Sequence, residues 1–72
     1  MYPFRRFVVH RRVVVNLLSG RAVEGVVVER DGPLLVVANA TLHEPGAQPH
    51  DVDGHVVIER SQVDFIQALT GR

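Results

Sequence analysis

Hydrophobic residues alternate with other residues along much of the chain, and short turn motifs separate the alternating stretches. Residues 13–18 read Val-Val-Val-Asn-Leu-Leu, and Ser19-Gly20 follows them. A period of two in β-branched residues predicts a strand, and the Ser-Gly pair predicts a hairpin turn. Residues 21–30 predict a second strand with apolar residues on both faces. Gly25 lies near its middle, where a residue without a side chain marks a sharp bend.

Three more strands are expected in the rest of the chain. Asp31-Gly32-Pro33 predicts a turn, and the nearly continuous apolar run of residues 34–42 predicts a central strand. Residues 44–54 contain two prolines and two glycines and therefore predict a loop. Shorter strands are expected at residues 55–59 and 63–66, with a frayed tail after them.

Five short strands in this order favour a mostly all-β fold, a five-stranded, strongly bent small barrel of SH3-like type. We expect a single domain over residues 1–72, with a cap segment at 1–10, the barrel at 11–67 and a tail at 68–72. The cap segment is interpreted as a short helical turn, although its two valines favour a strand. A chain of this length buries only about 60% of its unfolded surface. It has no cysteine, so association with other copies is the stabilising device that remains.

A sheet this small leaves open edges at its last two strands. An apolar edge readily pairs with another chain. Addition of the last strand of one copy to the preceding strand of the next is a head-to-tail contact, which forms a ring if the rotation closes. The residues expected at this oligomer edge are His55, Val56, Val57, Ile58, Val63, Asp64, Phe65 and Ile66. The open alternative is a monomeric SH3-like adaptor within a larger complex.

Charge is distributed unevenly, although the formal net charge is zero. Residues 1–23 carry five arginines and no acid, whereas residues 24–72 carry three arginines and eight acids, 3 − 8 = −5. This asymmetry indicates either an anion-binding face or two faces of one protein that meet each other. The arginines nearest the N-terminal aromatic residues are candidates for contact with nucleic acid; they are Arg5, Arg6, Arg11 and Arg12. In the alternative interpretation the aromatic residues cap the barrel and these arginines point into water.

Two segments of the chain carry a family resemblance. The first reads Val13-x-Val15-x-Leu17, Ser19-Gly20-Arg21, Val23-x-Gly25-x-Val27 and Asp31; the second reads Gly54 and then Ile58-x-x-x-x-Val63-x-x-Ile66. These motifs resemble those of the Sm-like proteins, including the bacterial Hfq branch, over about three quarters of the chain. The resemblance implies an Sm-like barrel, a homo-oligomeric ring of roughly five to seven subunits, and RNA binding without catalysis.

The residues that bind a base in Sm-like rings are not kept. In that family a base is sandwiched between an aromatic residue or histidine after the second strand and a basic residue of the second motif, and an asparagine reads the base edge. This chain has Pro33 and Leu35 at the first and last of these positions, and Glu59-Arg60 replaces the family's Arg-Gly pair. In the Hfq alignment Arg60-Ser61 replaces Lys-His.

The resemblance therefore implies RNA contact with a non-standard base pocket. The residues expected to contribute from the two motifs are Asp31, Arg60, Ser61 and Gln62. In the alternative interpretation Pro33 and Leu35 simply finish a hydrophobic strand, and Arg60 pairs with an acid of a neighbouring subunit. The ring is then a structural or protein-interaction module that has lost RNA binding.

Other chemistry finds little support in the sequence. His50, Asp51, Asp53 and His55 could ligate a metal, but their spacing fixes no coordination cage, so no metal site is expected. No nucleophile elbow, phosphate loop or dinucleotide fingerprint occurs, so we expect neither an enzyme nor a cofactor. No apolar run approaches the roughly 20 residues that span a bilayer, so no membrane partner is expected. Arg5 and Arg6 interrupt the N-terminal apolar stretch, which favours the cytoplasm over secretion.

Overall fold

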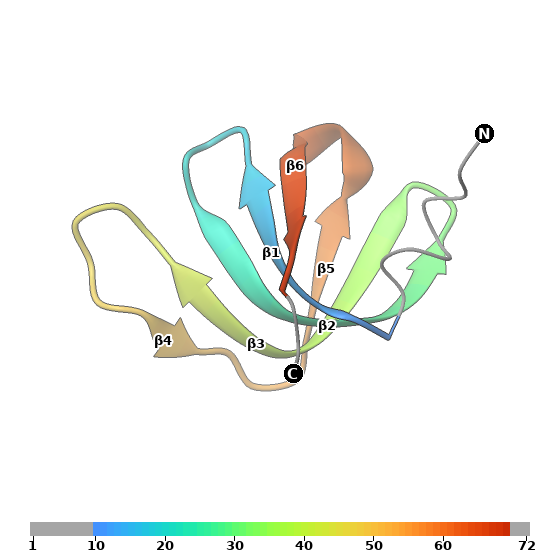
Figure 1. Ribbon diagram of the computed structural model, residues 1–72, viewed down its shortest axis with the longest axis horizontal. Coiled ribbons are helices and arrows are strands. Elements are labelled where there is room, and N and C mark those ends of the chain that lie inside the picture. The colour runs from blue at the N-terminus through green and yellow to red at the C-terminus, as the bar shows by residue number, and fades with distance from the viewer. Residues whose placement is uncertain (1–9, 70–72) are drawn as a thin grey trace.

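The computed structural model describes residues 10–69 as a single strongly bent antiparallel sheet (Figure 1). Its elements are β1 (Arg12–Leu17), β2 (Ala22–Asp31), β3 (Leu34–His43), β4 (His50–Asp51), β5 (His55–Glu59), the 3₁₀ helix η1 (Arg60–Gln62) and β6 (Val63–Ala68). The strands pair in the order β4-β3-β2-β1-β6, and β5 pairs with β3. This arrangement confirms the predicted mostly all-β small barrel. No helix within residues 10–69 has the length and apolar character needed to cross a membrane.

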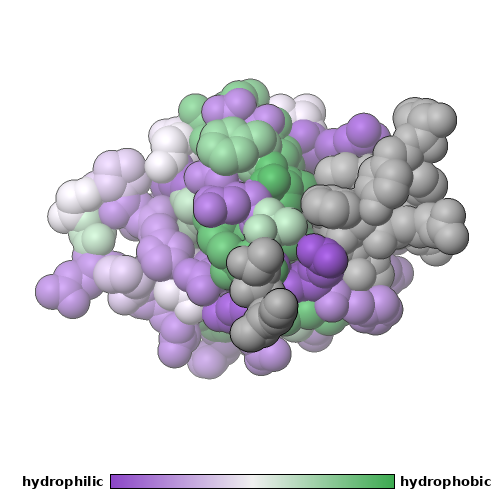
Figure 2. All heavy atoms as spheres, in the orientation of Figure 1, coloured by the Kyte–Doolittle hydropathy of each residue, from purple (hydrophilic) through white to green (hydrophobic). Residues whose placement is uncertain are grey.

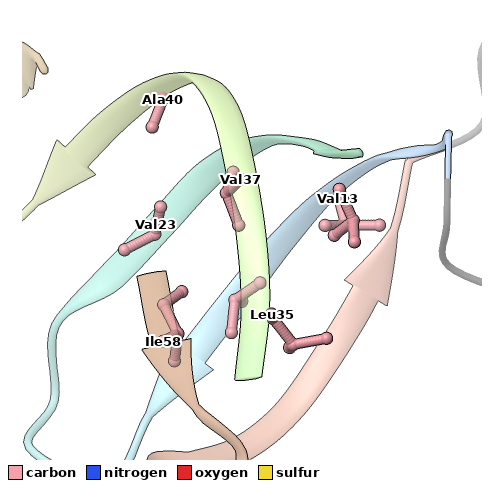
Figure 3. Close-up of a cluster of buried hydrophobic side chains, with 8 residues drawn as sticks. Val13, Val23, Leu35, Val37, Ala40 and Ile58 are labelled. Atoms are coloured by element: carbon pink, nitrogen blue, oxygen red, sulfur yellow. The ribbon is translucent and has the colours of Figure 1, made fainter. Parts of the chain in front are cut away.

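The core lies inside the bend and is built from four strands, with alternate residues of β1 and β2 and with residues of β3 and β5. Its buried side chains are Val13, Val15, Val23, Val27, Leu35, Val37, Ala40 and Ile58. Figure 3 shows the labelled members of this cluster converging between the strands. On β1 and β2 the intervening residues are half-buried or exposed, as expected for strands that turn one face to a core. The predicted alternation is therefore confirmed.

The bend of β2 and β3 depends on a close approach of the two strand backbones at Gly25. The β2–β3 register shifts between Glu24 and Val26, and a Cβ atom at Gly25 would lie 2.7 Å from the carbonyl oxygen of Ala38. The same Cβ would lie 2.7 Å from Cγ1 of Val37, a core side chain. Only glycine allows the two backbones to approach in this way, which agrees with the bend predicted at this position.

Replacing Gly25 by alanine is therefore expected to destabilise the fold. Because the added methyl group meets a backbone carbonyl and a packed core side chain, we expect a loss of about 1–3 kcal/mol in the free energy of unfolding, as for other overpacked cores. Urea denaturation followed by circular dichroism measures this loss. Alanine at Gly46 is the control, because no atom lies within 4 Å of the position of its Cβ. Gly46 has a φ of 76°, so some backbone strain is expected there, and equal losses in the two variants would contradict the steric argument.

Several predicted boundaries are corrected by the structure. The predicted loop of residues 44–54 contains the two-residue strand β4, which pairs with β3. Residues 60–62 form a 3₁₀ helix, and β6 continues through Ala68 into the expected frayed tail. The amide of Leu69 also donates a hydrogen bond to the carbonyl of Arg12. The predicted N-terminal helical turn falls on residues 1–9, which lie outside the described residues, and on His10, which is in a turn.

Three strands have an open edge within residues 10–69. The two-residue strand β4 and the strand β5 each pair only with β3, and β6 pairs only with β1, although η1 joins β5 and β6 along the chain. The edges of β5 and β6 are the two that the sequence predicts to be open. Figure 2 shows hydrophobic atoms gathered over the region of β6, in the centre of the visible face.

Candidate functional site

The two turns that carry the family motifs lie side by side in the structure. The amide of Arg60 donates a hydrogen bond to the carbonyl oxygen of Pro33 at 2.7 Å, which joins η1 to the β2–β3 turn. In the ladders Leu34 lies between Asp31 on β2 and Glu59 on β5. The hydroxyl of Ser61 donates to the carboxylate of Glu59 at 3.3 Å. We refer to this surface, formed by residues 31–34 and 59–61, as the two-turn face.

The two residues that stand at the family's base-pocket positions differ in their exposure to solvent. Pro33 is exposed in the turn. Leu35 is 1% exposed and belongs to the core, opposite Ile58 of β5. Its side chain is therefore not available to a ligand, which agrees for Leu35 with the alternative interpretation in which this residue belongs to a hydrophobic strand. Pro33 precedes β3 rather than forming part of it.

Gln62 contributes to a different surface from the two-turn face. It lines an apolar hollow of about 340 Å³, together with Leu17, Ser19, Arg21, Val23, Leu42, Val52, Val56, Val57, Ile58 and Glu59. The carbonyl oxygen of Gln62 accepts a hydrogen bond from the amide of Leu18 at 2.9 Å. The hollow is lined by residues of β5, so its wall includes one of the open strand edges.

Several residues of the predicted oligomer edge point into the barrel. Ile58 is buried, and Val56, Val63 and Ile66 are partly buried against the core. Val57 and Phe65 are instead each 57% exposed, and His55 and Asp64 are exposed as well. Val57 and Phe65 are therefore the large apolar side chains that these two strands present to the surroundings.

Two arginines of the basic N-terminal block are paired with acids of the acidic block. Nη2 of Arg12 lies 3.1 Å from Oε2 of Glu24, and Oε1 of the same glutamate lies 3.1 Å from Nε2 of His43. Arg21 lies 3.7 Å from Glu44. For these arginines the structure favours the interpretation in which two faces of one protein meet.

The remaining arginines of the block are Arg5, Arg6 and Arg11. Arg11 is exposed at the start of β1, where its carbonyl accepts a hydrogen bond from Val27. Arg5 and Arg6 lie outside the described residues. The Glu24 contacts were not predicted, because they depend on which residues face each other across three strands and no spacing along the chain shows this.

The loop residues considered as metal ligands do not gather around a common point. Within residues 10–69 no group of three or more histidine or acidic residues is placed to hold a metal ion. Asp51 instead accepts a hydrogen bond from the hydroxyl of Thr41 at 3.0 Å.

Comparison with known proteins places the fold. No model of a known protein family matches the sequence, and no curated protein matches it. Among solved structures, the crystal structure of the P. aerophilum SmAP1 heptamer is similar, with a TM-score of 0.77 and 21% sequence identity. The match covers 92% of this chain and 88% of that chain. The chain therefore has the Sm-like fold that its two sequence motifs predict.

Proposed function

We propose that this protein is a non-catalytic, homo-oligomeric ring of roughly five to seven subunits that binds RNA through arginines. The observation that carries the proposal is the pair of open edges on β5 and β6. Because β6 of one copy can extend the sheet beyond β5 of the next, the contact is head-to-tail and repeats the two-turn face once per subunit. The solved structure that this chain resembles is a heptamer, which supports a closed ring.

RNA contact on this ring centres on Arg60. Its backbone is held against the β2–β3 turn, so the side chain starts from a fixed point on the two-turn face. A guanidinium group can stack on a base or bind a phosphate, and both modes suit single-stranded RNA. Since Leu35 is buried, no asparagine-like reading of a base edge occurs at that position, and the expected sequence preference is weak. Asp31 and Ser61 complete the set of polar groups nearby.

We place this assembly in the cytoplasm, since a chain without cysteine suits a reducing compartment.

Fluorescence anisotropy with single-stranded oligo-U and oligo-A tests this proposal. We expect binding at low salt that weakens steeply as salt increases, because each neutralised phosphate releases counterions, with a slope of about −0.7 per phosphate. Arg60→Ala is expected to weaken binding about tenfold, and Arg60→Lys is the matched variant that keeps the charge but loses the planar stacking group. Absence of binding by the natural protein at low salt would contradict RNA binding, and an unchanged affinity in Arg60→Ala would remove Arg60 from the site.

A second function, a protein-interaction ring without RNA, is favoured by a specific observation. The chain has no excess of basic residues, with eight arginines and eight acids, and Glu59 occupies a position that is basic in the family. A carboxylate on the two-turn face disfavours phosphate. Native mass spectrometry of the purified protein separates the candidates: retained RNA supports the first, a stoichiometric protein partner on a ring supports the second, and a single-subunit mass supports the adaptor.

A further inference from the structure

A polar hollow lies where β3 and β4 pass the start of β1. Its volume is about 350 Å³, at the lower end of the range for small-ligand sites. The residues that line it are Arg12, Asn39, Ala40, Thr41, Asp51 and Val52. None of them belongs to the two-turn face or to the apolar hollow except Val52, which lines both hollows.

A bulge in β3 brings Asn39 to this hollow. Val26 of β2 faces Ala38, but Glu24 faces Thr41, so β3 has one more residue than β2 over this stretch. Asn39 takes up the difference with a left-handed φ of 52° and is exposed. Bulges commonly redirect a side chain, and asparagine tolerates this backbone region better than most residues. The carboxamide of Asn39 can both donate and accept hydrogen bonds.

Neighbouring side chains hold the two charged groups of the hollow. Thr41 donates to Oδ1 of Asp51 at 3.0 Å, which leaves Oδ2 as an acceptor for a ligand. Nη2 of Arg12 donates to Glu24 at 3.1 Å, which leaves its other N–H groups as donors. Because these contacts restrict both side chains before a ligand arrives, less conformational entropy is lost on binding.

The combination of groups selects a class of ligand. An aspartate beside an arginine that is already paired with a glutamate does not attract a phosphate, and the polar walls do not suit an apolar group. A carboxylate that accepts hydrogen bonds, together with a guanidinium and an amide that donate them, suits a neutral group that can both donate and accept hydrogen bonds, namely a hydroxyl. In RNA that group is the 2′-hydroxyl of ribose, which distinguishes RNA from DNA.

We propose that this hollow binds a ribose of the RNA chain, with Asp51 accepting a hydrogen bond from the 2′-hydroxyl and Asn39 and Arg12 donating to ribose oxygens. The inference rests on the proposed RNA binding and deepens it, because it assigns the choice of RNA over DNA to a site away from the two-turn face. The hollow contacts an uncharged hydroxyl group of the RNA, whereas Arg60 contributes a positive charge to binding.

Anisotropy measurements with oligo-U and with oligo-dU of the same length and label test the proposal. We expect the natural protein to bind oligo-U about three- to tenfold more tightly than oligo-dU, the range for one or two hydrogen bonds. Asn39→Ala and Asp51→Asn are expected to bring the two affinities within about twofold of each other by weakening only the binding of oligo-U. Asp53→Asn is the matched control, because Asp53 is an exposed acid near the hollow that does not line it. Native mass spectrometry of each variant verifies that the assembly is unchanged.

The outcomes separate this inference from the function on which it rests. If the natural protein binds neither oligomer, RNA binding fails and the ribose site fails with it. If it binds RNA but the variants keep its preference over DNA, or it has no such preference, only the ribose site is overturned. Equal weakening of both oligomers in the variants also overturns it, because the lost contact is then common to RNA and DNA.

Discussion

Replacing Phe65 by aspartate is expected to convert the proposed ring into single subunits. Phe65 is 57% exposed on the open edge of β6, opposite Asn16, and Val57 is equally exposed on the open edge of β5, opposite Val36. Asn16 and Val36 lie on the outer side of the sheet, away from the core. A sheet that continues from β5 into β6 of the next copy therefore brings Phe65 and Val57 together on one face, where cross-strand apolar pairs stabilise the contact. A buried, unpaired carboxylate at this place opposes association by several kcal/mol.

Native mass spectrometry and light scattering after size exclusion measure this change, and circular dichroism verifies that the subunit remains folded. Leu18→Asp is the matched control. Leu18 is 64% exposed, more than Phe65, but it lies in the β1–β2 turn and on neither open edge. We expect its variant to keep the mass of the natural assembly. If the Phe65→Asp protein still forms rings, or if the Leu18→Asp protein dissociates into single subunits to the same extent, the contact between subunits uses another surface.

The core positions of this fold could be predicted from the sequence because burial on one side of a strand imposes a period of two. Val13 and Val15 of β1, and Val23 and Val27 of β2, are all buried as the alternation indicates. The open edges followed from the small number of strands in the same way. These features depend on local pattern and strand count, which a single sequence contains.

Features that depend on register could not be predicted in this way. The strand β4 exists because residues 50 and 51 come opposite β3, and nothing in their own sequence favours a strand. The bulge at Asn39 likewise reflects how β3 meets β2 around Gly25. The same reason explains why the contacts of Glu24 and the place of Gln62 were missed, since both depend on which strands and turns become neighbours.

The candidate site includes one feature that the local sequence predicts and one that depends on the register of the strands. The sequence predicts that the family's base pocket is not kept, because proline and leucine lack the required polar groups. It could not show that Leu35 faces the core while Pro33 stays exposed. This difference decides whether the pocket could be restored by substitution. We expect a family-like residue to be tolerated at the exposed position 33, whereas one at position 35 must enter the core.

Replacing Leu35 by asparagine is accordingly expected to unfold the barrel rather than restore a uridine pocket. The substitution removes a fully buried leucine, a change that typically costs about 2–5 kcal/mol, and it places an amide among valine and isoleucine side chains without a partner. Because small domains are stable by only about 5–15 kcal/mol, we expect a fall of roughly 15 °C or more in the melting temperature at equal protein concentration. Thermal denaturation by circular dichroism measures this fall, and anisotropy with oligo-U measures any gain in affinity.

Pro33→His is the companion variant, because it places the family's residue type at an exposed position whose backbone carbonyl still accepts the hydrogen bond from Arg60. Its expected loss of stability is below about 1 kcal/mol. The contrast between the two variants carries the argument, since both restore a family residue and only one of them enters the core. A Leu35→Asn protein that melts like the natural one and prefers oligo-U over oligo-A would place this side chain in contact with the base. The Sm-like pocket would then be altered in composition but not in location.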